Sequence, residues 1–102
     1  MIGKPNRYVP ATLPEVRDYV GAMIIAVPDL VDSITVGGVD GAYASLQEGF
    51  DLIRKRLGDE LHSKLSQMAQ ASHAHFAEGE RKEGRLMLQL IDEAMTQRRR
   101  VH

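Results

Sequence analysis

Apolar residues recur at helical spacing along most of the chain, and the stretches are bounded by residues that favour helix ends. The first stretch begins after Thr12, which can cap free N–H groups while Glu15 completes a capping box. It should end or kink at Pro28, whose ring removes a donor and clashes with the preceding turn. Residues 1–11 contain one glycine and two prolines, so we expect them to form an extended arm.

A second amphipathic stretch spans residues 41–57. Its large apolar side chains lie three and four residues apart, which is typical of a helix that packs lengthwise on another helix. Asp40 is expected to cap its start and Gly58 to end it. The preceding residues 29–36 suit either a short helix or a strand. Because the chain offers no partner strand, we predict a helix there.

Two more helices complete the pattern. Asp59 is expected to cap the third helix, and a break around Gly79 separates it from a last helix that ends near Arg98. All connections are short, so consecutive helices should be antiparallel neighbours. The predicted fold is therefore all-α, a compact antiparallel bundle of four to five helices formed by residues 12–102, with residues 1–11 as an extended N-terminal arm.

Composition narrows the class of protein. The chain has 102 residues with 43% hydrophobic and 26% charged side chains, which is typical of one globular domain. It contains no cysteine, which excludes disulfides and thiolate metal sites and agrees with a cytoplasmic location. The longest apolar run, residues 22–27, is too short to span a bilayer, so we expect no membrane partner.

Charge is distributed unevenly although the net charge is only −1. Residues 1–53 carry three basic and seven acidic side chains, whereas residues 54–102 carry ten basic and seven acidic ones. Such asymmetry can orient association with a charged partner, and two antiparallel copies could complement each other.

Candidate chemistry is sparse. His73 and His75 lie two residues apart on one helix, roughly 200° apart around its axis, and cannot share an ion without distortion. His62 has no second ligand one turn away. The glycine-rich residues 37–41 lack the Gly-Lys-Ser/Thr ending of a nucleotide-binding loop. We therefore predict no catalytic residue, cofactor or metal site.

Two surface patterns point to binding instead. Apolar residues of the last helix cover an arc of roughly 200°, wider than the arc of a little over 100° that a surface helix of a monomer needs. In the second helix the small residues Gly41, Ser45 and Gly49 recur every four residues, which suits close approach of a helix from a partner or from the same chain. The residues expected at an interface are Leu86, Met87, Leu90, Met95, Gly49, Arg54 and Arg98.

These patterns favour a small cytoplasmic, non-catalytic helical protein that binds other proteins. It would form a homodimer or hold a partner protein, for example as an immunity- or antitoxin-type inhibitor, an adaptor or a secretion chaperone. The alternative is a nucleic-acid-associated regulator that uses the basic clusters Arg54–Arg56 and Arg98–Arg100. The negative net charge and the lack of aromatic residues between these bases weigh against that alternative.

Overall fold

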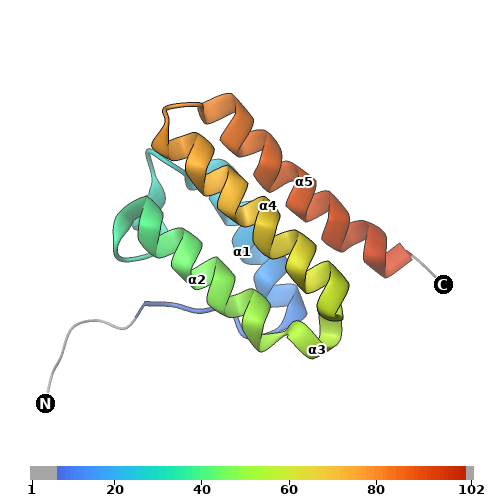
Figure 1. Cartoon of the computed structure of the whole chain (residues 1–102). Helices are drawn as coiled ribbons and strands as arrows, with labels where there is room; N and C mark the ends of the chain where they lie inside the picture. The colour runs from blue at the N-terminus through green and yellow to red at the C-terminus, as the bar shows by residue number, and fades with distance from the viewer. Residues whose placement is uncertain (1–6, 101–102) are drawn as a thin grey trace, which may run out of the picture.

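The computed structural model describes the backbone of residues 7–100 and the side chains of residues 7–97. Every regular element in this part of the chain is helical, which confirms the predicted all-α bundle (Figure 1). The elements are α1 (Leu13–Ala26), the 3-10 turn η1 (Val31–Ser33), α2 (Gly38–Leu52), α3 (Arg54–Leu57), α4 (Asp59–Ala77) and α5 (Arg81–Arg100).

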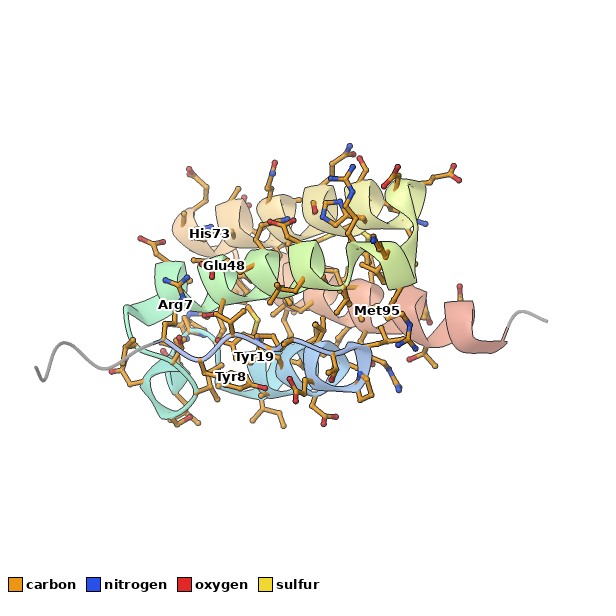
Figure 2. All side chains as sticks on the ribbon, turned by 90° about the horizontal axis from the view of Figure 1, so that it is seen from below. Arg7, Tyr8, Tyr19, Glu48, His73 and Met95 are labelled. Atoms are coloured by element: carbon orange, nitrogen blue, oxygen red, sulfur yellow. The ribbon has the colours of Figure 1, made fainter. Side chains whose placement is uncertain are left out.

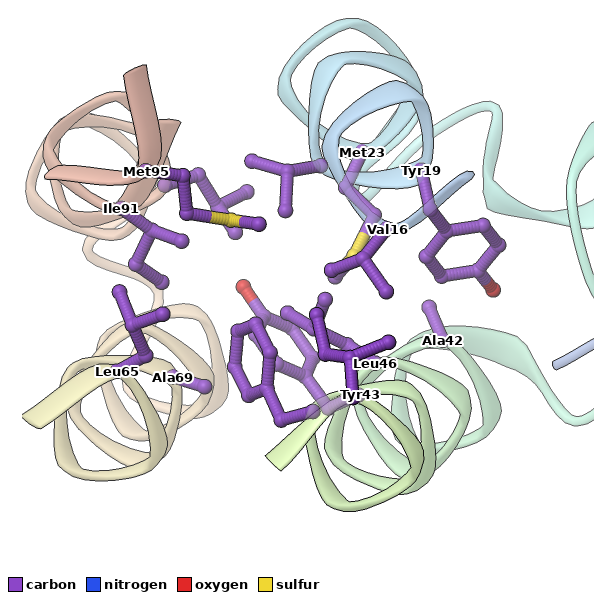
Figure 3. Close-up of a cluster of buried hydrophobic side chains, with 14 of the residues drawn as sticks. Val16, Tyr19, Met23, Ala42, Tyr43, Leu46, Leu65, Ala69, Ile91 and Met95 are labelled. Carbon is purple, nitrogen blue, oxygen red and sulfur yellow. The ribbon is translucent and has the colours of Figure 1, made fainter. Parts of the chain in front are cut away.

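The four long helices enclose one hydrophobic core. α4 and α5 lie side by side and run antiparallel, joined by a turn in which Gly79 has a φ of +80°. α2 also packs on α4, and α1 packs on both α2 and α5. Figure 3 looks along the helices and shows side chains from all four meeting between them. The largest fully buried apolar side chains are those of Phe50, Met23, Leu46, Leu65, Leu88, Ile91 and Met95.

The start of α1 follows the sequence prediction. Thr12 is the N-cap residue, and its hydroxyl accepts a hydrogen bond from the Glu15 N–H at 3.3 Å. The Glu15 carboxylate in turn accepts from the N–H of Ala11 at 2.9 Å, one residue earlier than in a standard capping box. α1 ends at Ala26, and Val27 is extended, as expected for a residue before proline.

The segment between α1 and α2 differs from the prediction. Within residues 29–36 the regular element is the short 3-10 helix η1, Val31–Ser33, so the choice of a helix over a strand is confirmed, but the helix is shorter than expected. Asp40 is also not the cap of α2. Gly37, with a φ of +95°, is the N-cap residue and places Asp40 inside the first turn. The two consecutive glycines, Gly37 and Gly38, both have positive φ, which lets the chain change direction one turn before Asp40.

The predicted helix over residues 41–57 is two helices. α2 ends at Leu52, and Ile53 leaves helical geometry with a φ of −101° and a ψ of 16° before α3 begins. Gly58 ends α3 as predicted, with a φ of +84° and its N–H bonded to the Arg54 carbonyl. Asp59 is the first residue of α4 rather than its cap, and the N-cap residue is Gly58. The Asp59 carboxylate accepts a hydrogen bond from the Arg54 side chain at 2.9 Å.

The arm packs against the bundle over the part that the structure describes. Residues 7–11 are extended and run along α1 and α2, while residues 1–6 lie outside the described range (Figure 2). The Pro10 side chain is fully buried, and the Arg7 guanidinium forms an ion pair with the Glu48 carboxylate of α2. The arm is therefore part of the folded unit at these residues.

One hydrogen-bonded chain crosses the core between three helices. The Tyr43 hydroxyl of α2 lies 2.5 Å from the Ser72 hydroxyl of α4, which lies 2.8 Å from the Gly84 carbonyl of α5. A carbonyl can only accept, and serine has one hydroxyl proton, so Ser72 donates to Gly84 and Tyr43 donates to Ser72. Burial of the ring, partly offset by the Ser72 hydrogen bond, raises the pKa of Tyr43 to about 12. The hydroxyl is therefore a neutral structural donor at ordinary pH.

Candidate interaction surface

The wide apolar arc of α5 divides into a buried half and an exposed half. Leu88, Ile91 and Met95 are buried in the core, whereas 53% of the Leu86 surface and 38% of the Leu90 surface remain exposed. At about 100° per residue, the two exposed leucines are adjacent on α5. They lie on the side of the helix opposite the buried line, which is formed by Leu88, Ile91 and Met95. The outer face of α5 therefore presents two neighbouring leucines, one helical turn apart.

The predicted contact role of Met95 is wrong, because its side chain is 1% exposed and packs in the core (Figure 3). α1 and α4 both pack on α5, and the side of α5 that faces them carries the buried line through Met95. Met87 is half-buried and lies at the margin of the exposed face. Of the apolar residues predicted at the interface, Leu86 and Leu90 are thus the two that are well exposed.

The predicted contact role of Gly49 is also wrong, because the chain itself occupies the hollow above this residue. A β-carbon at Gly49 would lie 2.9 Å from the Pro10 Cγ atom, 3.0 Å from the Pro10 carbonyl oxygen and 3.2 Å from Val16 Cγ2. A β-carbon at Gly41 would meet the backbone carbonyl of Val36. The row of small residues in α2 therefore seats the arm, α1 and the loop before α2, all from the same chain, and not a helix of a partner.

Arg54, one of the two basic residues predicted at the interface, lies among charges of both signs. Arg54 is exposed, and its guanidinium pairs with the Asp59 carboxylate. The shallow groove beside it is lined by Lys55 and also by Asp51 and Asp59. Two carboxylates in this groove reduce its attraction for a phosphate backbone. The side chain of Arg98 lies outside the described side chains.

Charged and polar residues border the two exposed leucines. Lys82, Glu83 and Gln89 line a shallow surface groove of about 390 Å³ together with Leu86 and Arg85. The Arg85 guanidinium is held by the α1 backbone, donating to the carbonyls at the end of that helix. An apolar centre with a charged border is the usual arrangement of a protein-binding surface.

The histidines serve the contact between helices. The His73 ring lies 2.7 Å from the Asp40 carboxylate and stacks on the Tyr43 ring, with centroids 4.6 Å apart. His62 forms a second 2.7 Å contact with Asp51, near the other end of the α2–α4 seam. The hydrogen bond from His62 is the main reason that the pKa of Asp51 lies below its usual value. These pairs join α2 to α4 and are absent from the sequence prediction.

Metal-ligating side chains do not converge in the described part of the chain. No group of three or more histidine and carboxylate residues there could hold an ion. His75 is half-buried and its Nδ1 atom lies 2.7 Å from the Glu80 carboxylate. Each described histidine thus has its own carboxylate partner.

Comparison with protein-family models, curated proteins and solved structures finds no significant match to this chain. Among the described residues, no helix combines the length and the apolar character needed to cross a membrane. The case for function therefore depends on the surfaces of the molecule itself.

Proposed function

We propose that this protein is a non-catalytic, cytoplasmic helical module that works through protein–protein contacts, and that it associates with itself through the outer face of α5. The observation that supports this proposal is the exposure of Leu86 and Leu90, side by side at the centre of that face. Such a module could act on a further partner protein as a toxin inhibitor, an adaptor or a chaperone.

The charges around the leucines suit a symmetric pair of α5 helices. If two copies cross antiparallel with Leu86 of one beside Leu90 of the other, Lys82 and Glu93 lie on the same flank of the contact. At 1.5 Å per residue, Lys82 lies roughly 9 Å and Glu93 roughly 8 Å from the midpoint between Leu86 and Leu90, in opposite directions along the helix. Lys82 of each copy therefore comes opposite Glu93 of the other. Both side chains are exposed, and neither forms an ion pair with a described residue.

The expected association is weak. One pair of helices centred on two leucines covers less than the roughly 1,200–2,000 Å² of stable interfaces. The dimer should thus form in a concentration-dependent way, with a dissociation constant on the order of micromolar or above.

Leu90→Glu tests this proposal by sedimentation equilibrium over a hundredfold range of protein concentration. We expect the wild type to shift from monomer to dimer and Leu90→Glu to stay monomeric, with an unchanged helical circular dichroism spectrum because the side chain is partly exposed. Gln67→Glu on the exposed surface of α4 adds the same charge and serves as the matched control, which should still dimerise. A wild type that is monomeric throughout this range overturns self-association.

A charge exchange then tests the orientation. Lys82→Glu should weaken the dimer because it places like charges opposite each other, and the double variant Lys82→Glu/Glu93→Lys should restore it. Binding to DNA or RNA that weakens steeply with salt, in place of association, would instead support the nucleic-acid alternative.

A further inference from the structure

A second surface feature lies where the arm runs beside α1, on a different helix from the leucines of α5. It is a shallow groove of about 240 Å³. The residues that line it are Tyr8, Glu15, Asp18, Tyr19, Ala22 and Ile34. The volume is below the roughly 300–1,000 Å³ of sites that enclose whole small molecules. The groove therefore has room for one side chain of a larger partner.

The groove combines one exposed tyrosine ring with two carboxylates, which are groups that attract cations. Tyr8 is 50% exposed, and the centroid of its ring lies 5.7 Å from that of the Tyr19 ring; Figure 2 labels both residues. Tyrosine ring faces attract cations. Partial burial and the nearby carboxylates of Glu15 and Asp18 raise the pKa of Tyr8, as expected where the local potential is negative. Asp18 is exposed and forms no ion pair with any described residue.

The Tyr19 hydroxyl supplies an independent indication of a ligand. Tyr19 is only 5% exposed, yet its hydroxyl is buried without a hydrogen-bond partner among the described residues. Figure 3 shows that its ring points away from the centre of the core, with the hydroxyl at the outer end. Buried polar groups in folded proteins are nearly always hydrogen-bonded. A donor from a bound partner would satisfy this one.

We propose that the groove binds an arginine side chain from a basic segment of a protein partner. A guanidinium group is planar, so it can stack on Tyr8 while its N–H groups reach the Asp18 carboxylate and the Tyr19 hydroxyl. The opposite charges of groove and segment provide the complementarity. A divalent metal ion fits less well, since the groove supplies two carboxylates and no third ligand of that kind among its lining residues.

The probe is an acetylated, amidated tri-arginine peptide, titrated into isotope-labelled full-length protein and followed by amide chemical shifts. Saturable shifts are expected at Tyr8, Asp18 and Ala22, and they should weaken as salt increases. Asp18→Asn should weaken binding about two- to fivefold. Glu60→Gln, which removes an exposed carboxylate at the start of α4, is the charge-matched control and should leave binding unchanged.

A second pair of variants tests whether the aromatic face of Tyr8 itself contributes to binding. Tyr8→Phe keeps the aromatic face and should keep most of the affinity, whereas Tyr8→Leu should lose about two- to fivefold. The proposal is overturned if tri-arginine causes no saturable shifts in the groove. It is equally overturned if Glu60→Gln weakens binding as much as Asp18→Asn, since the peptide would then respond only to net charge. Neither result depends on whether α5 forms dimers.

Discussion

Replacing Ser72 by alanine should destabilise the protein more than replacing Tyr43 by phenylalanine. Ser72→Ala leaves the buried Tyr43 hydroxyl without its acceptor, at a cost of about 1–3 kcal/mol. Tyr43→Phe removes that donor, but Ser72 still donates to the Gly84 carbonyl, so the loss is about 0.5–1.5 kcal/mol. For a domain of this size, 1 kcal/mol corresponds to a melting-temperature shift of roughly 4–8 °C.

The double variant Ser72→Ala/Tyr43→Phe completes a thermodynamic cycle, measured by urea unfolding with circular dichroism at constant pH. Because it removes both partners, it should cost about 1 kcal/mol less than the two single losses together. If Ser72→Ala costs no more than Tyr43→Phe, the direction assigned to this hydrogen-bonded chain is wrong, and additive losses would show that the Tyr43–Ser72 hydrogen bond does not couple the two residues.

Two further predictions concern backbone space and pH. Gly41→Ala should destabilise the protein, because a β-carbon there would meet the Val36 carbonyl. Gly21→Ala should stabilise α1 by about 0.5–1 kcal/mol, because no atom lies within 4 Å of a β-carbon at this position. Thermal melts of both variants check this, and equal effects would contradict it. Asp51 has a lowered pKa, so its stabilising contribution is present above its unfolded value of 3.8 and is lost as the pH falls through the folded value. The urea midpoint should therefore fall less between pH 5 and pH 3 in Asp51→Asn than in the wild type. An equal fall of the midpoint in both proteins would show that the His62 contact contributes nothing.

Helix positions could be predicted largely from local chemistry. Thr12 accepts the capping hydrogen bond that its sequence context indicates, and Gly58 and Gly79 adopt the positive φ expected between helices. The break at Ile53 carries no such signal, because its neighbours continue the apolar spacing of α2. The extent of the helix before α2 could not be predicted for a related reason. Its apolar residues suit several conformations, and contacts with other elements select among them.

The surface was harder to predict because it depends on residues distant in sequence. The width of the apolar arc on α5 was visible, but its buried side is set by packing against α1 and α4. That packing places Met95 inside and leaves Leu90 partly outside. The occupant of the hollow at Gly49 is Pro10, and no pattern in either segment indicates their contact. The Tyr8 groove was missed entirely, since the arm had no predicted position on the bundle.

The packing of α1 on α5 also bears on how the chain folds during synthesis. α1 comes before the other helices of the bundle in the chain and α5 comes after them, yet the two share an interface. Until α5 is available, the apolar faces of α1 and α4 lack one of their neighbours, and a partly synthesised chain exposes them to water. The bundle should therefore close late and cooperatively, and a nascent chain that lacks α5 should be a substrate for molecular chaperones.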